Sequence, residues 1–369
     1  MPDIFRLMIV EDNDDMFETY QDAADEYSDE TTIIEVVRKE NADEALEALL
    51  SKDFDGAIVD LNLSRSEPDE ASGNKVIEEV FNKHRFPIFV VSGNLENLYP
   101  HFRAKESDFF KFFNRDTPNE EIFIPFLKVF KTGITKILGG RGVIEKRLGE
   151  IFWSHLANNF NIWSDEESNV EKILLRYTVS HLGEYLDMPD GESRFYHQAE
   201  FYIKPPIKEY IASGDIISIN GHKYINLSPA CDVDVRDVIE GKPIINANRV
   251  VVAPLVKIDR ASFISEGLIK EGDGKKARNK VVEDIIKGKR DRFSFLPEYV
   301  DIEASLIDFQ NVHAFSFEDI DLSQRIATVS GLFLKDIQSR FSAYYGRQGQ
   351  PDLDKASLIQ NCQLLLAPE

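Results

Sequence analysis

Three acidic residues and one hydroxyl group follow short apolar runs in the first hundred positions of this chain. Glu11 and Asp12 close the run MIVED, Asp60 closes AIVD, and Ser92 closes FVVS. If these runs are neighbouring strands, three carboxylates converge at one edge of a sheet and repel one another unless a hard cation lies among them. Mg²⁺ takes oxygen ligands readily. The cluster therefore predicts that a divalent metal ion binds among the three carboxylates.

The scaffold needed to bring these residues together is visible in the pattern of the first 130 residues. Short apolar runs alternate there with segments of helical spacing. The predicted strands are 5–10, 31–37, 56–61, 87–91 and 109–113, and the predicted helices are 14–27, 41–51 and 75–81. This alternation favours an α/β fold, a doubly wound five-stranded parallel sheet whose ligands bind at the carboxyl ends of the strands.

The segments MIVEDND, AIVDLNL and FVVSGN, in this order, resemble the acidic pair, the phosphoacceptor strand and the hydroxyl strand of response-regulator receiver domains. The resemblance covers about residues 1–131 and implies a flavodoxin-like fold. It implies that Asp60 accepts a phosphoryl group from a cognate histidine kinase. Mg²⁺ would be held by Asp12, Asp60 and the backbone carbonyl of Asn62, and Glu11 would reach the ion through water. Ser92 would hydrogen-bond a phosphoryl oxygen, the family's route from chemistry to a changed surface.

One position departs from the family's pattern. Receivers close the site with a lysine after the fifth strand, but the segment KFFNRDT places Arg115 there if Phe112 and Phe113 form the strand core. Lys111 is the competing candidate. Arg115 is the preferred choice, although an arginine differs from a lysine in length and geometry. Phe112 would take the family's aromatic switch position without the hydroxyl of a tyrosine.

Length, charge and cysteine content restrict the class of protein. The chain has 369 residues and a net charge of −22, so several modules are expected. Residues 1–130 hold 30 Asp and Glu against 13 Lys and Arg, which makes nucleic-acid binding by this part unfavourable. No apolar stretch reaches the roughly 18 residues of a membrane span, and no signal-peptide pattern is present. Cys231 and Cys362 form no disulfide framework. These features predict a cytoplasmic protein without membrane contact.

Residues 132–190 are expected to form a helical connector. Gly133, Gly139, Gly140 and Gly142 suggest a flexible hinge, and helical patterns follow at 143–160 and at 166–186, the second opened by Ser164 as a cap. His155 and His181 lie on these helices. They are candidates for phosphotransfer, but satisfied or solvated histidines are the preferred interpretation.

Residues 191–369 are expected to form an α+β output domain with a small β-barrel-like part, because short β-branched runs from Ala199 onward are separated by Gly, Pro and Asn. His222, Cys231, Asp232 and Asp234 could approach a metal there. Their spacing matches no zinc pattern, and a buried cysteine beside capping aspartates is the alternative.

Two later segments are basic or aromatic. Residues 270–292 are rich in Lys and Arg on an amphipathic helix, a face that could bind an acidic partner but is more often solvated. Phe341, Tyr344 and Tyr345 have helical spacing before a glycine, which core packing explains. Neither a helix-turn-helix nor a catalytic triad nor a nucleotide loop is recognisable after residue 131, so the output region is expected neither to bind DNA nor to be an enzyme.

The sequence therefore predicts a response regulator in which phosphorylation of Asp60 changes how the receiver docks on residues 132–369, on a downstream protein effector or in a homodimer. A phosphate sink or relay protein is the alternative. Receivers with unfamiliar tails are similar, in architecture alone, to components of bacterial phage-defence operons. An enzyme gated by phosphorylation is a third alternative. Function resides in sites rather than in folds, so the fold does not choose among them.

Overall fold

The computed structural model describes residues 2–63, 72–159, 169–186, 195–239, 242–348 and 352–365. The chain divides into two compact units, residues 1–190 and 191–369, and each unit is described by itself. Within the described ranges, no helix combines the length and the apolar character that crossing a membrane requires.

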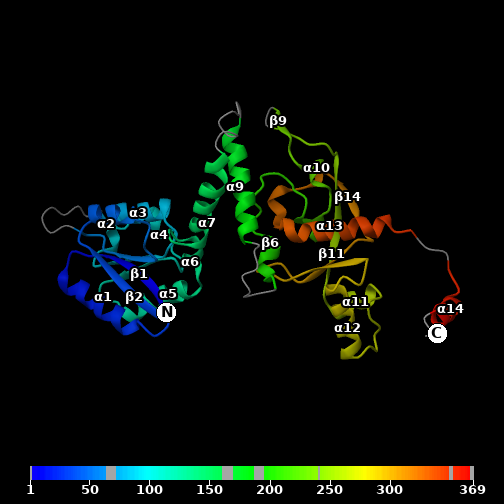
Figure 1. The fold of residues 1–369 in the computed structure, drawn as a ribbon, viewed down its shortest axis with the longest axis horizontal. Coiled ribbons are helices and arrows are strands. Elements are labelled where there is room, and N and C mark those ends of the chain that lie inside the picture. The colour runs from blue at the N-terminus through cyan, green and yellow to red at the C-terminus, as the bar shows by residue number, and fades with distance from the viewer. Residues whose placement is uncertain are drawn as a thin grey trace. The chain divides into compact units, whose positions relative to one another are not determined.

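A five-stranded parallel sheet is the centre of the first unit (Figure 1). Its strands are β1 (Asp3–Val10), β2 (Thr32–Lys39), β3 (Gly56–Val59), β4 (Ile88–Ser92) and β5 (Phe110–Asn114). They pair in the order β2-β1-β3-β4-β5, and every pairing is parallel. This is the order of flavodoxin-like sheets, and it confirms the doubly wound fold predicted from the sequence.

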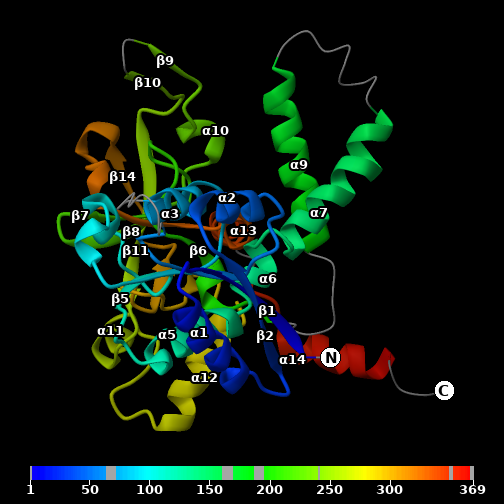
Figure 2. The ribbon, with the colours of Figure 1, turned by 90° about the vertical axis from the view of Figure 1, so that its left-hand side faces the viewer.

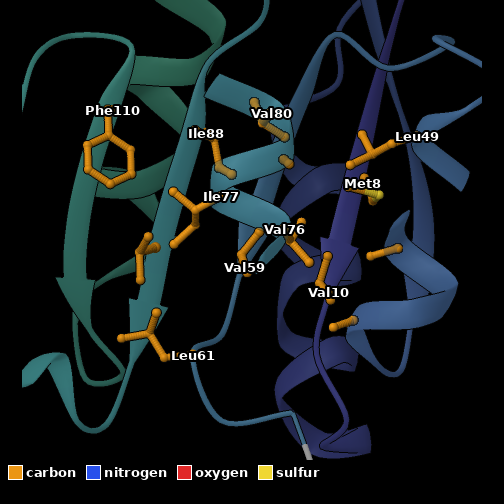
Figure 3. Close-up of a cluster of buried hydrophobic side chains, with 14 of the residues drawn as sticks. Met8, Val10, Leu49, Val59, Leu61, Val76, Ile77, Val80, Ile88 and Phe110 are labelled. Atoms are coloured by element: carbon orange, nitrogen blue, oxygen red, sulfur yellow. The ribbon is translucent and has the colours of Figure 1, made fainter. Parts of the chain in front are cut away.

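Helices cover both faces of this sheet because successive strand residues point to opposite sides. The helices are α1 (Asp14–Tyr27), α2 (Ala42–Leu49), α3 (Ser72–Lys83), η1 (Leu95–Asn97), α4 (Pro100–Arg103) and α5 (Asn119–Lys131). Along β1, Met8 and Val10 join a buried cluster with α2 and α3, which Figure 3 shows, whereas Leu7 and Ile9 join another with α1 and α5. Continuous apolar runs such as β3 follow from burial on both faces.

The predicted elements differ from the observed ones mainly at their ends, but helix α5 (Asn119–Lys131) was missing from the predicted helices. Strand β3 ends at Val59, so Asp60 lies just beyond it rather than inside it. Helix α3 begins at Ser72, three residues before the predicted start. Helix α4 was not predicted, because its four residues are too few to show a helical repeat.

Residues 132–186 continue the first unit as helices: α6 (Ile134–Leu138), α7 (Val143–Ile151), the π-helical segment η2 (Phe152–Leu156), η3 (Ala157–Asn159) and α9 (Val170–Leu186). The single helix predicted over 143–160 is therefore wrong, because its hydrogen bonding changes after Ile151. Residue 160, the proposed cap at Ser164 and residues 166–168 lie outside the described residues.

Three of the four glycines of the expected flexible hinge, Gly139, Gly140 and Gly142, pack closely against backbone atoms, whereas a Cβ on Gly133 would meet no atom within 4 Å. A Cβ on Gly140 would lie 2.3 Å from the carbonyl oxygen of Lys52, so only a glycine allows this approach. Two ion pairs hold the same segment against the sheet: Arg141 with Asp55 at 2.5 Å, and Lys136 with Asp3. Glycine can be needed at such positions because backbone atoms approach closely, and not only because it makes the chain flexible.

The second unit is built on an eight-stranded sheet whose pairings are all antiparallel. Its strands are β6 (Tyr202–Ile203), β7 (Asp215–Ile219), β8 (His222–Asn226), β11 (Arg249–Lys257), β12 (Phe293–Leu296), β13 (Ser305–Asp308), β14 (His313–Ser316) and β15 (Arg325–Val329). The order is β12-β13-β11-β8-β7-β15-β6, with β14 also on β11. The expected barrel-like part is not found, because no pairing among the described strands joins β12 to β6. A separate hairpin pairs β9 (Asp237–Ile239) with β10 (Lys242–Ile244).

Five α-helices and three 3-10 helices complete the described part of this unit: α10 (Ala230–Val233), α11 (Arg260–Ser265), α12 (Lys275–Ile286), α13 (Gly331–Gly346), α14 (Lys355–Leu365), η4 (Gln198–Phe201), η5 (Phe317–Asp319) and η6 (Leu322–Gln324). Phe341 and Tyr344 of α13 pack in a cluster with the sheet, as predicted, whereas Tyr345 is 54% exposed. The basic helix α12 buries Val281 and Ile285, and Lys280 is paired with Asp284 one turn along. Its pattern is that of a solvated, ion-paired face.

Candidate functional site

Five polar residues meet at the carboxyl edge of the first sheet. Glu11 and Asp12 follow β1, Asp60 follows β3, Ser92 is the last residue of β4, and Arg115 follows β5. Glu11 and Asp60 are 1% exposed and Ser92 is fully buried. Because β1 lies beside β3 and β3 beside β4, the sheet order itself brings these residues together.

The carboxylates form a cluster suited to a cation. Oxygen atoms of Glu11, Asp12 and Asp60 lie within 4.8 Å of one another, and no other such group of potential ligands occurs in the described part of the chain. The Oδ1 atom of Asp60 is buried and has no hydrogen-bond partner. A buried acceptor without a partner is costly. An all-oxygen donor set with one unsatisfied oxygen fits a hard divalent ion.

Asn62 lies beside this cluster but is exposed. Its side-chain Oδ1 accepts a hydrogen bond of 3.1 Å from Nδ2 of Asn97, which follows β4. This bond links the loop after β3 to the loop after β4. Asn62 Oδ1 is thus engaged, which agrees with an expected ligand role for the backbone carbonyl rather than for the amide.

The two candidates for the closing cation differ in position. The guanidinium of Arg115 forms an ion pair with Asp60 Oδ2 and lies 3.4 Å from Glu11 Oε1. Lys111 lies within β5, and its ammonium is 3.6 Å from Asp108, a residue that precedes the strand. The structure therefore brings Arg115, and not Lys111, into contact with Asp60.

Burial and charge shift the ionisation of Glu11. Burial, followed by the nearby charge of Asp60, raises the pKa of Glu11 to about 7. The backbone N–H of Asn13, which donates to Glu11 Oε1 at 3.1 Å, and the charge of Arg115 oppose this shift. At neutral pH without a metal, the carboxyl group of Glu11 is thus close to half protonated.

This shift predicts a pH dependence of stability in metal-free protein. Since the folded pKa of Glu11 is raised from 4.5, its contribution is present below pH 4.5 and is lost as the pH rises through about 7. We expect the free energy of unfolding of the first unit to fall over this window. Denaturant titrations in EDTA between pH 5 and pH 8 would measure it, with Glu11→Gln as the comparison. An equal slope in both proteins would contradict the assignment to Glu11.

Two residues that sequence reasoning missed also border the site. The hydroxyl of Tyr20 on α1 is buried without a hydrogen-bond partner, and burial together with the charges of Glu11 and Asp60 raises its pKa. Gly73 on α3 lies so close to the strand that a Cβ there would be 2.2 Å from the carbonyl oxygen of Asp60. The spacing of Tyr20, Ala23 and Ala24 on one helix face was a signal for the first. No pattern in the sequence indicates the close approach of Gly73 to Asp60.

The structure does not bring the candidate residues of the second unit together as a metal site. His222 and Cys231 are exposed, Asp234 is paired with Lys208 at 2.9 Å, and Cys231 contacts only its neighbour Asp232 among these candidates, at 3.7 Å. The expected buried cysteine is therefore wrong as well.

The two histidines of the connector are engaged by neighbouring aromatic residues. His155 Nε2 is 3.1 Å from the hydroxyl of Tyr185, and His181 Nδ1 is 2.9 Å from the carbonyl oxygen of Tyr177. The two imidazole rings lie 4.9 Å apart. These contacts fit satisfied histidines, the preferred interpretation of the sequence.

The first unit is similar to receiver domains among the solved structures. A receiver domain from Methylobacillus flagellatus is 19% identical, over 34% of this chain and 98% of that chain, with a TM-score of 0.28. The receiver domain of RstA from Klebsiella pneumoniae is 16% identical over 34% and 96%, with a TM-score of 0.25. A Francisella response-regulator receiver is 14% identical over 34% and 97%, with a TM-score of 0.27. No protein-family model and no curated protein matches the chain.

The N-terminal third of the chain thus has the strand order of a flavodoxin-like sheet with a cluster of acids at its carboxyl edge, and it is similar to receiver domains of known structure. Residues 191–369 remain without an assigned family.

Proposed function

We propose that this chain is a two-component response regulator whose receiver accepts a phosphoryl group on Asp60 from a histidine kinase in the cytoplasm. The observation that supports it is the cluster of buried Glu11 and Asp60 with half-buried Asp12, in which Arg115 pairs with one Asp60 oxygen and the other has no partner. A solvated set of strand-end acids would be neither buried nor closed by an arginine.

The residues present have separate tasks in this proposal. A carboxylate oxygen of Asp60 attacks phosphorus in line, the bond from phosphorus to the histidine nitrogen breaks, and an acyl phosphate forms on Asp60. Asp12, Asp60 and the backbone carbonyl of Asn62 would hold Mg²⁺, with Glu11 in its water shell. When bound, that ion neutralises charge on the transferring group. Burial raises the pKa of Glu11 in the metal-free site, so Mg²⁺ binding and loss of the Glu11 proton would favour each other.

Two side chains would then form new contacts with the phosphoryl group on Asp60 and so change the surface of the receiver. Ser92 Oγ, which now accepts a 3.4 Å hydrogen bond from the backbone N–H of Asn94, would donate its proton to a phosphoryl oxygen. Arg115 would exchange Asp60 for phosphoryl oxygens, which suit a guanidinium's paired donors. Both changes move loops after β4 and β5. We infer that these loops contact the output region or a partner protein, and that DNA is not the target.

The experiment is a mass and hydrogen-exchange comparison of the full chain, with acetyl phosphate or beryllofluoride, in Mg²⁺ and in EDTA. We expect a gain of one phosphoryl group only in Mg²⁺, with changed exchange in residues 93–118 and in residues outside the receiver. If phosphorylation changed hydrogen exchange only within the receiver, the phosphate sink or relay would be favoured instead. No modification would overturn the phosphoacceptor function.

Arg115 and Lys111 can be separated in the same assay. We expect Arg115→Gln to lower the rate of phosphorylation by acetyl phosphate by about tenfold or more, because a charge-assisted contact of about 1.5–3 kcal/mol is lost. We expect Lys111→Gln to have a smaller effect, since its ammonium is paired with Asp108. The opposite order of effects would assign the closing cation to Lys111.

A further inference from the structure

Helix α9 (Val170–Leu186) carries an apolar stripe that is largely exposed among the described residues of the first unit. None of its 17 residues is buried. Figure 2 shows that α7 and α9 cross and then diverge, so α7 accompanies only part of the helix. The guanidinium of Arg147 on α7 lies 5.2 Å from the centre of the Tyr185 ring on α9.

The stripe repeats at the spacing of a coiled-coil seam. Leu175, Val179, Leu182 and Leu186 follow one another at intervals of four, three and four residues. Three of them are strongly exposed: Leu175 at 64%, Val179 at 60% and Leu186 at 55%. A narrow stripe of this kind is the surface that another helix covers in a coiled coil. We call these four residues the α9 seam.

The residue types at the seam select the number of helices. In heptad terms, Val179 and Leu186 occupy a positions, and Leu175 and Leu182 occupy d positions. A β-branched residue at a with leucine at d favours two strands in a parallel coiled coil. Val179 with its flanking leucines fits that rule.

The charged residues beside the α9 seam indicate which kind of helix can pair with it. Glu171 occupies a g position, and Arg176 occupies the e position of the following heptad. In a parallel pair of identical helices, each g residue faces the e residue five positions further along the partner. Glu171 of one chain then faces Arg176 of the other, twice by symmetry. Glu171 and Arg176 are thus complementary to a second copy of the helix, whereas Lys172, at the a position before Val179, is a polar residue of the kind that fixes register at a cost in stability.

We propose that the α9 seam is the homodimerisation surface of this protein, formed by two α9 helices in parallel. The contact is isologous, because the same residues meet across a two-fold axis. It does not depend on the proposed phosphorylation of Asp60, since none of its residues belongs to the receiver site.

The first test compares the molar mass of the full chain and two variants by light scattering over a concentration series. We expect the wild type to have about twice the chain mass of 42.2 kDa and Val179→Glu to be shifted toward monomer. Burying two carboxylates at an a layer should raise the dissociation constant on the order of 100-fold. Ser180→Glu introduces the same side chain at an exposed neighbouring position off the seam and should remain dimeric.

A disulfide test reports the orientation. In a chain with Cys231→Ser and Cys362→Ser, we expect Leu182→Cys to form an intermolecular disulfide under mild oxidation, because identical d positions meet only in a parallel pair. A monomeric wild type, an equal loss of dimer in Ser180→Glu, or dimers unaffected by Val179→Glu would overturn the proposal. A dimer that forms no Leu182→Cys disulfide would overturn the parallel arrangement.

Discussion

Replacing Asp60 by asparagine is expected to abolish phosphoryl transfer to this chain. The change keeps the volume of the side chain but removes the carboxylate that would attack phosphorus, and an amide oxygen is a poor nucleophile and a weaker cation ligand. We expect no mass gain with acetyl phosphate in Mg²⁺ and no Mg²⁺-dependent binding of beryllofluoride. Intact-mass measurement after a fixed incubation is sufficient to show it.

Asp116→Asn is the matched control, because Asp116 is exposed and lies next to Arg115 in the same loop. It removes one carboxylate without touching the cluster, so phosphorylation should proceed as in the wild type. A phosphoryl group found on Asp60→Asn would show that another residue is the acceptor. Peptide mapping of the modified protein would then locate it.

Gly73→Ala is expected to destabilise the receiver and to weaken cation binding together. The added Cβ would lie 2.2 Å from the carbonyl oxygen of Asp60 and 2.8 Å from Cα of Leu61, and both are backbone atoms that have little room to move. Overpacking of this kind costs about 1–3 kcal/mol. The strain falls on the residue that carries the nucleophile. Thermal unfolding with and without Mg²⁺ would show a lower transition temperature and a smaller shift by the ion.

Gly149→Ala is the same chemical change as Gly73→Ala, but we expect it to increase the free energy of unfolding. Gly149 lies inside helix α7, and a Cβ there would meet no atom within 4 Å. Alanine loses less backbone entropy than glycine in a helix, so a gain of roughly 0.5–1 kcal/mol is expected. If both variants lost stability equally, the close approach at Gly73 would not be the cause.

Most of the fold of the first unit could be predicted because its strands and the helices α1, α2 and α3 each carry a local signal. Helix α1 was placed from Asp14 to Tyr27, and Asn13 caps it by accepting a 3.1 Å hydrogen bond from the backbone N–H of Met16. Strand β4 was recognised as a continuous apolar run. In residues 191–369 the strands were also visible locally, but closure into a barrel depends on which strands pair. That depends on contacts far apart in the sequence, such as those of β11 with β8, β13 and β14.

The candidate site was predicted in part for the same reason. Glu11, Asp12, Asp60 and Ser92 could be named because strand ends of a parallel sheet converge. The choice between Arg115 and Lys111 depended on where β5 ends, and element boundaries are the least certain part of a sequence prediction. Gly73 could not be found at all, because its role is a distance to the backbone of another element.

The ion pair between Arg115 and Asp60 means that the chain carries a cation tethered to its own phosphoacceptor. A tethered group acts at an effective concentration that is often in the millimolar range. A divalent cation that binds Asp60 must therefore displace the guanidinium of Arg115, which stays attached to the chain. The receiver would then respond to the supply of free divalent ions as well as to its kinase, and replacing Arg115 by an uncharged side chain would shift the ion concentration at which it responds.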